Sequence, residues 1–289
     1  MINFLFFTFW TGRSRHGWMS RLVDEMSGPR GEELGRKALI SRRLGVAFGF
    51  ALVISLSLAT ARSDTSAAGV RSMSDLGFRP VLLDFYEELL RDDDLQKFRR
   101  NVEPRYMPAT LERLLSASDS ETRRAALTAL GFLGSYDQNA RVAGLLADED
   151  PFVRDLAMRV LWIIWYRADT PANNAQLARV RQLIATEQLE QAVELSTRLI
   201  ERAPEFAEAW NQRAIANFFL RRFEESSADC KRALHLNPYH VGALGGLAQC
   251  QVMLGRPAEA IRTYRRAIKL EPFNEALREN VNALETEGR

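Results

Sequence analysis

Three prolines near the end of the chain, Pro204, Pro238 and Pro272, stand 34 residues apart. This is the length of a helix–turn–helix unit that cannot bury its own apolar face and must stack on further copies. Each proline stands two residues before the end of its window and ends the second helix of the unit, because proline lacks an N–H and restricts the residue before it. The windows are 173–206, 207–240 and 241–274. The period predicts a helical repeat protein that presents a surface to another chain.

Equivalent positions of the windows carry similar side chains. Position 20 holds Ala192, Ser226 and Ala260, which are small enough for two helices of a unit to meet closely. The third window carries the fullest pattern: Leu244, Leu247, Ala248, Gly255, Ala260, Tyr264, Ala267 and Pro272. The second keeps Trp210, Ala214, Phe223, Ala233 and Pro238, and the first diverges most. The pattern resembles the tetratricopeptide repeat (TPR), with W-x2-L-G-x2-Y, A-x3-F, A and P.

A second self-similarity, with a period of 31 residues, lies upstream. Asp119 aligns with Asp150, and Arg123 aligns with Arg154. Asp150 before Pro151 is a strong helix start, because an N-cap carboxylate precedes a proline at the first helical position. Residues 108–167 resemble the short HEAT-like repeat of phycobilisome lyases and bacterial scaffolds.

The recurring Asp and Arg have two interpretations. In the structural one, which we favour, the Asp caps a helix and the Arg hydrogen-bonds the turn of a neighbouring repeat. In the functional one, a row of Arg side chains binds an acidic partner. The apolar run 161–166 is interpreted as helix-packing surface near the join with the first TPR unit rather than a cofactor site.

The predicted fold is all-α, a right-handed α-solenoid of stacked helical hairpins, HEAT-like and then TPR. We assign 81–107 to an N-terminal helical cap, 108–170 to HEAT-like repeats, 171–274 to three TPR units and 275–289 to a C-terminal capping helix. Only four residues, 168–171, separate the arrays, so a continuous stack is expected.

An uncharged segment, 44–61, follows four basic residues and ends in Ala59-Thr60-Ala61. It is typical of a cleaved secretory signal, with an uncleaved single membrane anchor as the alternative. Either places the repeats outside the cytoplasm, in the periplasm or secreted, as in bacterial exported TPR scaffolds. Residues 1–43 form the cytoplasmic n-region, within which Met19 and Met26 are alternative starts, and 62–80 is a linker.

The charge distribution and the sequence motifs exclude several classes of function. Residues 1–80 carry a balance of +5, residues 81–170 of −4 and residues 171–289 of +1. The repeat body thus lacks the basic stripe that binding phosphates needs, so no nucleic-acid partner is expected. His235 and His240 have no metal-ligand or catalytic spacing, and no nucleotide-binding motif occurs. We predict no catalytic residue, cofactor or metal. Cys230 and Cys250 are interpreted as buried thiols, with a disulfide as the alternative.

The TPR resemblance implies that the first helix of each unit lines a concave, ligand-facing surface. The implied peptide-binding residues are Leu177, Arg181, Asn211, Ile215, Phe218, Phe219, Gln249, Val252 and Met253. The family's carboxylate clamp is absent, because Leu177, Arg181, Gly242 and Gly246 stand at its positions. The other groove-lining positions are expected to form an apolar floor of the groove, which Gly242 and Gly245 widen.

The predicted function is a non-enzymatic scaffold or adaptor that binds a peptide or helix of another protein in this groove. Alternatively, residues 62–80 fill the groove, or its side chains only pack between helices. The alternative class is a chromophore-lyase-like enzyme or enzyme subunit, which the HEAT resemblance suggests.

Overall fold

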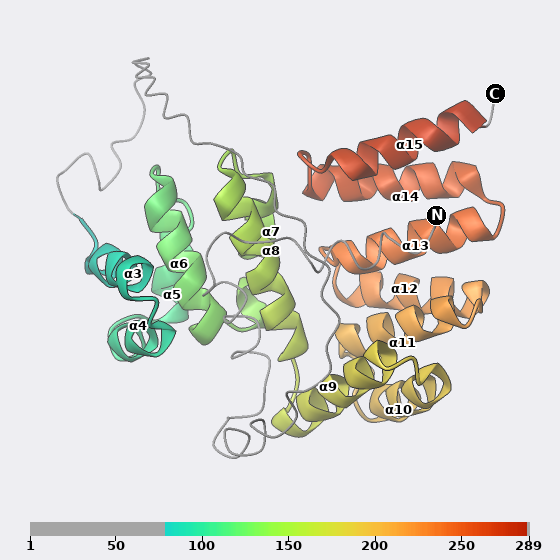
Figure 1. Cartoon of the computed structure of the whole chain (residues 1–289), viewed down its shortest axis with the longest axis horizontal. Coiled ribbons are helices and arrows are strands. Elements are labelled where there is room, and N and C mark those ends of the chain that lie inside the picture. Colours follow the sequence, from blue (N-terminus) through green and yellow to red (C-terminus); the bar gives the residue numbers. More distant parts are fainter. Residues whose placement is uncertain (1–78, 288–289) are drawn as a thin grey trace, which may run out of the picture. The chain divides into compact units, whose positions relative to one another are not determined.

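A computed structural model of the chain describes residues 79–287, and residues 80–287 lie in one compact unit. All regular elements of this part are helices, as predicted, and they form an all-α solenoid (Figure 1). No helix between residues 79 and 287 has both the length and the apolar composition that crossing a bilayer requires. The predicted segments 1–43 and 44–61, and all but the last two residues of the predicted linker, lie outside the described residues.

The described part begins with a helical pair, α3 (Val81–Asp92) and α4 (Leu95–Val102). Asp93 adopts a left-handed backbone conformation, with φ of 55°, and turns the chain between the two helices. Asp94 then caps α4 by accepting a hydrogen bond from the backbone N–H of Lys97 at 2.8 Å. Apolar side chains such as Leu89 and Phe98 are buried in the same core as the helices that follow.

The HEAT-like region consists of α5 (Pro108–Leu114), α6 (Ser120–Leu133), the 3₁₀ turn η2 (Tyr136–Gln138), α7 (Asn139–Gly144), the 3₁₀ turn η3 (Leu145–Ala147) and α8 (Pro151–Tyr166). Asp119 and Asp150 cap α6 and α8 through backbone N–H groups, as predicted. Arg123 donates to the carbonyl oxygens of its own turn and to Asp148 in the next turn at 2.8 Å. Arg154 donates to the carbonyl oxygens of Asp148 and Glu149 in its own turn, so of the two recurring arginines Arg123 is the one that bonds the next turn.

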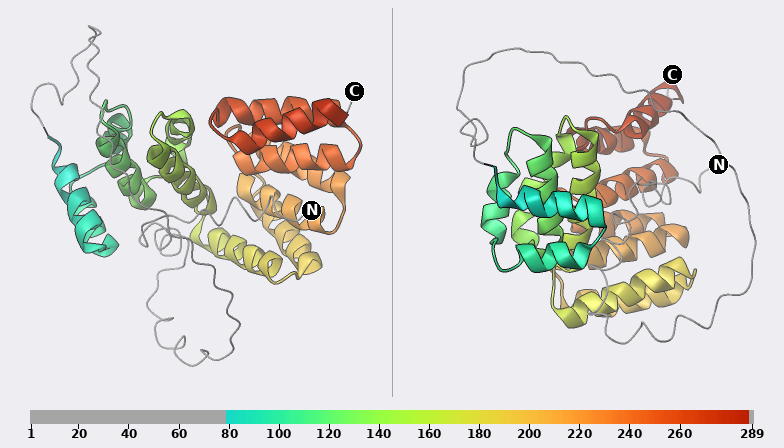
Figure 2. Two further views of the ribbon diagram at one scale, coloured as in Figure 1. Left: turned by 45° about the horizontal axis from the view of Figure 1, so that its top comes forward. Right: turned by 60° about the vertical axis from the view of Figure 1, so that its left-hand side comes forward.

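The TPR region consists of three helical hairpins and a final helix, seen as successive layers in Figure 2. The hairpins pair α9 (Pro171–Ala185) with α10 (Leu189–Arg202), α11 (Ala207–Phe219) with α12 (Phe223–Leu236), and α13 (Val241–Met253) with α14 (Pro257–Leu270), and α15 (Glu275–Glu287) follows. Helices α10, α12 and α14 each end two residues before one of the periodic prolines. The small residues at position 20 are all buried, and the Ser226 hydroxyl donates to the Ala214 carbonyl oxygen at 2.8 Å.

The two arrays meet in more places than a linear stack requires. Helix α8 contacts α9 and α11, the first helices of the first and second hairpins. It also reaches the turn before α13, where the ring of Trp165 stacks on the ring of His240 at 4.3 Å. Val241 accordingly belongs to the apolar core of the HEAT-like region. Helix α8 therefore packs against the turns between repeats as well as against the neighbouring helix α9.

Candidate binding surfaces

The predicted groove residues on the last turns of α11 and α13 are accessible. Phe219 is 45% exposed, Val252 37% and Met253 36%. We call these three residues the apolar end patch. Phe218 is half-buried beside it, and its ring meets Phe219 and Phe223 edge-on at 6.1 and 5.4 Å. The patch is an apolar surface at the carboxyl ends of two helices that contact each other.

The middle of the predicted groove is partly covered. Ile215 on α11 and Gln249 on α13 are both half-buried. Gly245 on α13 faces open space, because a Cβ atom built there meets no atom within 4 Å. This part of the surface remains accessible between the two helices.

Two of the predicted groove residues are packed between helices and do not form part of the exposed groove surface, so the prediction is corrected for them. Leu177 is buried in an apolar cluster with Leu199 and Phe206. Asn211 is also buried, and its amide donates to Glu208 Oε1 at 3.0 Å. Both side chains stabilise the fold, because they lie where the first helices pack on their neighbours.

The HEAT-like region also occupies the beginning of the groove. The guanidinium group of Arg181 lies 3.7 Å from the ring centroid of Tyr166 at the end of α8. Gly242 does not widen the groove, because a Cβ atom there would lie 2.8 Å from Trp162 Cη2. The run 161–166 is packing surface, as predicted, and its aromatic rings cover the amino-terminal part of the groove.

A hydrogen-bond relay joins α8 to the turn between α12 and α13. Trp165 Nε1–H donates to Asn139 Oδ1 at 2.7 Å, and Asn139 Nδ2 donates to Asn237 Oδ1 at 2.9 Å. The same Asn237 oxygen accepts from the backbone N–H of Tyr239 at 3.2 Å. These bonds fix the orientation of the Asn237 amide and leave its Nδ2 buried with no hydrogen-bond partner.

A buried His–Glu pair lies beside this relay. His240 is 0% exposed, and its Nε2 lies 2.7 Å from Oε2 of Glu208, which is 1% exposed. His240 Nδ1 accepts from the backbone N–H of Ala243 at 3.1 Å and so caps α13. Because Nδ1 accepts, it carries no proton, and Nε2–H donates to the carboxylate of Glu208. Sequence reasoning weighed His240 only as a metal or catalytic residue; its place directly before a helix was the signal for a cap.

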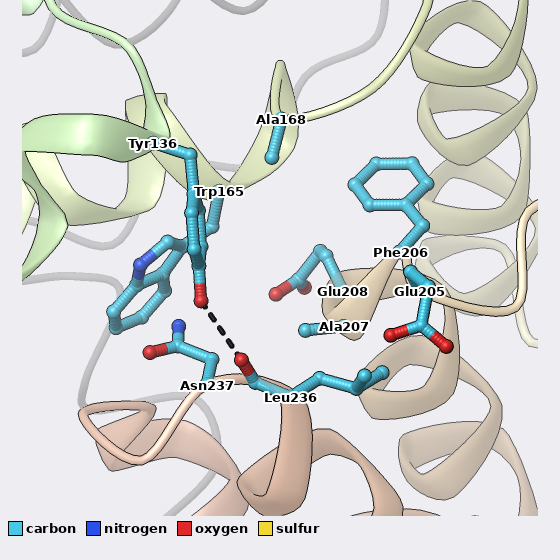
Figure 3. Close-up of a pocket in the computed structure, with 9 residues that line it drawn as sticks. All are labelled: Tyr136, Trp165, Ala168, Glu205, Phe206, Ala207, Glu208, Leu236 and Asn237. Atoms are coloured by element: carbon cyan, nitrogen blue, oxygen red, sulfur yellow. Dashed lines mark hydrogen bonds between the residues drawn. The ribbon is translucent and has the colours of Figure 1, made fainter.

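A pocket of about 290 Å³ opens between the HEAT-like region and the TPR units. Figure 3 shows its wall residues, which are Tyr136, Trp165, Ala168, Glu205, Phe206, Ala207, Glu208, Leu236 and Asn237. The Tyr136 hydroxyl donates to the Leu236 carbonyl oxygen at 3.0 Å, and this hydrogen bond spans one side of the pocket. The pocket combines aromatic walls with the Glu208 carboxylate and the Asn237 amide.

A second hollow, of about 420 Å³, adjoins the first and shares Tyr136 and Ala168 with it. Asp137, Asp169 and Arg167 contribute its charged groups. Arg167 donates to the carbonyl oxygens of Leu130 and Gly134, and burial lowers its pKa to about 10. We call the two hollows together the junction cleft.

The two cysteines, also considered from the sequence, are not arranged to bind a ligand. Cys230 and Cys250 are buried free thiols, and Cys250 Sγ lies 3.1 Å from Ser226 Oγ. Within residues 79–287 no group of His, Cys, Asp and Glu side chains could hold a metal ion.

Family models place the repeats along the chain. The model described as HEAT repeats matches residues 107–195, and two models described as tetratricopeptide repeat match 177–241 and 220–279. The HEAT match extends over α9 and part of α10, in keeping with the divergence of the first TPR unit.

Similar proteins share only part of the chain. A TPR repeat-containing protein of Rhizobium etli is 32% identical over 81 residues, which are 28% of this chain and 40% of that protein. Sperm-associated antigen 1 of Rattus norvegicus is 32% identical over 98 residues, or 34% of this chain and 11% of that protein. The chain thus spans less than half the length of these curated relatives.

Among solved structures, the first TPR domain of Spaghetti (RPAP3), bound to an HSP90 peptide, is 21% identical. The match covers 41% of this chain and 94% of that domain, with a TM-score of 0.40. The family models and the helical hairpins together show that residues 107–279 consist of HEAT-like repeats followed by tetratricopeptide repeats.

Proposed function

We propose that the protein is a non-enzymatic interaction scaffold that binds a peptide or helix of another protein at the apolar end patch. The observation that carries this proposal is the exposure of Phe219, Val252 and Met253 at the ends of two adjacent helices. Apolar side chains that gather on a surface are typical of interaction sites, because water solvates them poorly. A helix laid in a groove buries such side chains at regular intervals.

The proposed contact surface comprises the apolar end patch and the half-buried residues beside it: Ile215, Phe218 and Gln249. Arg181 lies at its margin, held over the ring of Tyr166. A partner would therefore enter from the carboxyl ends of the first helices, because aromatic residues of α8 occupy the other end. Burying the exposed remainder of the three patch side chains would stabilise a complex by about 1 kcal/mol for each, because each is already more than half buried.

A site-specific photo-crosslinker tests this proposal. The crosslinker replaces Met253 in one variant and Met107, which is 72% exposed just before the HEAT-like region, in another. We expect a discrete protein adduct from position 253 and none of the same mass from position 107. The double substitution Phe219→Asp and Val252→Asp in the Met253 crosslinker background should abolish that adduct. Identical adducts with and without these aspartates would refute the proposal.

For localisation, we propose export, with the repeats outside the cytoplasm. The support is the uncharged segment 44–61 with its preceding basic residues. Fractionation and amino-terminal sequencing of the mature protein test this directly. A mature chain that starts at Arg62 in the periplasm indicates cleavage, and an intact chain in the membrane fraction indicates an anchor. A cytoplasmic protein with an intact segment 44–61 would contradict export.

A further inference from the structure

We propose that the junction cleft is a second binding site, which takes an extended peptide segment carrying lysine side chains. One lysine enters the pocket beside Glu208, and the peptide continues over Tyr136 into the second hollow. This site is separate from the apolar end patch, because Glu208 lies in the first turn of α11 and Phe219 is the last residue of that helix. The proposal therefore does not depend on the function proposed for the patch.

The first observation is the unpaired amide of Asn237. This residue is 1% exposed, and its Nδ2 has no hydrogen-bond partner. Its Oδ1 already accepts from Asn139 and from the backbone of Tyr239, so a flip of the amide would break two bonds. In Figure 3 the nitrogen lies on the side of the amide toward Tyr136 and the pocket. A buried donor without an acceptor is costly, so a ligand carbonyl at this point would be stabilising.

The second observation is the carboxylate of Glu208, which is buried without a cation. Asn211 and Gln212 donate to Oε1 at 3.0 and 2.7 Å, and His240 donates to Oε2. All three donors are neutral, because His240 Nδ1 accepts a backbone hydrogen bond. A carboxylate offers about four acceptor positions, so Oε2 retains one. Buried charges are normally compensated by an opposite charge, and a ligand ammonium group would supply it.

Other residues that line the cleft also carry carboxylates. Asp137 and Asp169 line the second hollow, and its cation, Arg167, has donors directed at backbone carbonyl oxygens. Glu205 at the pocket rim pairs with Arg232 at 2.9 Å, but its side chain is largely exposed, so the pair is weak. The residues that line the cleft thus include four carboxylates and one guanidinium group.

The shape of the cleft favours a peptide over a small cation. The two hollows share Tyr136 and Ala168, so one ligand can run through both. A peptide offers carbonyl oxygens to Asn237 Nδ2 and ammonium groups to the carboxylates. Lysine suits the pocket better than arginine, because Glu208 has one acceptor position left and cannot receive a two-pronged guanidinium. The aromatic rings of Trp165 and Tyr136 match the apolar stem of a lysine.

The proposal is tested with a labelled peptide of about ten residues, acetylated and amidated, with two lysines in a glycine–serine background. Binding to the whole chain is followed by fluorescence anisotropy at low salt, and by NMR of the Asn237 side-chain amide. We expect saturable binding and a shifted Asn237 amide resonance. Replacing both lysines with norleucine should weaken binding about tenfold or more, because the charge-assisted bonds are lost.

Two matched double variants distinguish binding in the cleft from a general effect of the protein's charge on binding. Asp137→Asn with Glu205→Gln changes two exposed side chains at the cleft and should weaken binding severalfold. Glu194→Gln with Glu279→Gln makes the same charge change on exposed positions of α10 and α15, and should leave binding unchanged. Equal affinity of the two double variants, no binding of the lysine peptide, or equal binding of the norleucine peptide would each overturn the proposal. So would a free-amine version of the norleucine peptide that binds as well as the lysine peptide, since the amino terminus would then be the ligand.

Discussion

The imidazole ring of His240 lies on the indole ring of Trp165, with centroids 4.3 Å apart and planes at 22°. This stack joins the last HEAT-like helix to the turn that opens the third TPR unit. The same imidazole caps α13 and donates to the buried carboxylate of Glu208. One side chain thus couples three elements that are distant in the sequence.

Substituting His240→Ala should destabilise the protein by about 3 kcal/mol. It removes a helix cap, worth about 1 kcal/mol, and a hydrogen bond to a buried carboxylate, worth about 1.5–3 kcal/mol. Urea denaturation followed by circular dichroism measures the change. His235→Ala is the matched control, because His235 is exposed on α12 and should cost less than about 0.5 kcal/mol. Equal stability of the two variants would show that the His240 contacts do not stabilise the fold.

The two glycines of α13 should respond oppositely to alanine. Gly242→Ala places a Cβ atom 2.8 Å from Trp162 Cη2 and should destabilise by about 1–3 kcal/mol, because the packed ring must shift. Gly245→Ala meets no atom within 4 Å and should stabilise by about 0.5–1 kcal/mol, because alanine is the better helix former. Thermal unfolding of both variants tests the prediction. If both alanine variants were more stable than the wild type, Trp162 would not pack closely against α13 in solution.

Burial raises the pKa of Glu271, just after α14, from 4.5 to about 7, although a hydrogen bond from Asn274 opposes the shift. The folded state therefore keeps a proton that the unfolded state releases. The stabilising contribution is fully present below about pH 4.5 and is lost as the pH rises through about 7. It amounts to at most about 3 kcal/mol.

Glu271→Gln should flatten the pH dependence of the unfolding free energy between about pH 5 and 8. Denaturant titrations at a series of pH values measure this slope. The exposed Glu275 provides the control, since Glu275→Gln should keep the wild-type slope. An unchanged slope in Glu271→Gln would contradict the raised pKa.

The thiols of Cys230 and Cys250 should resist modification in the folded protein. Both are buried and free. Hydrogen bonding to Cys250 and burial raise the pKa of Cys230, whereas hydrogen bonding to Cys230 lowers the pKa of Cys250. The thiolate is the reactive form, so Cys230 is protected by its raised pKa and by burial, and Cys250 by burial alone. An aromatic disulfide reagent should therefore modify the two thiols only after denaturation. Fast modification of the native protein, at rates typical of exposed thiols, would show that the α12–α13 contact opens readily.

Much of the architecture was predictable because the same pattern of residue types recurs at fixed intervals along the sequence. The 34-residue and 31-residue periods predicted the helical hairpins, the caps at Asp119 and Asp150, and the small residues at Ala192, Ser226 and Ala260. Each of these features depends on neighbours within one repeat or the next. The apolar character of Phe219, Val252 and Met253 was equally readable, since their positions in the repeat indicate the concave face.

The tertiary structure decided which of these positions are accessible and where the arrays touch. Leu177 and Asn211 occupy groove positions by their place in the repeat, yet neighbouring helices bury them. The contacts of Trp162 with Gly242 and of Trp165 with His240 join residues that no repeat period relates. Sequence alone determined the repeating unit, because its hydrogen bonds and packing are local. Only the folded chain determined the junction cleft, because that cleft depends on how one array packs across the turns of the other.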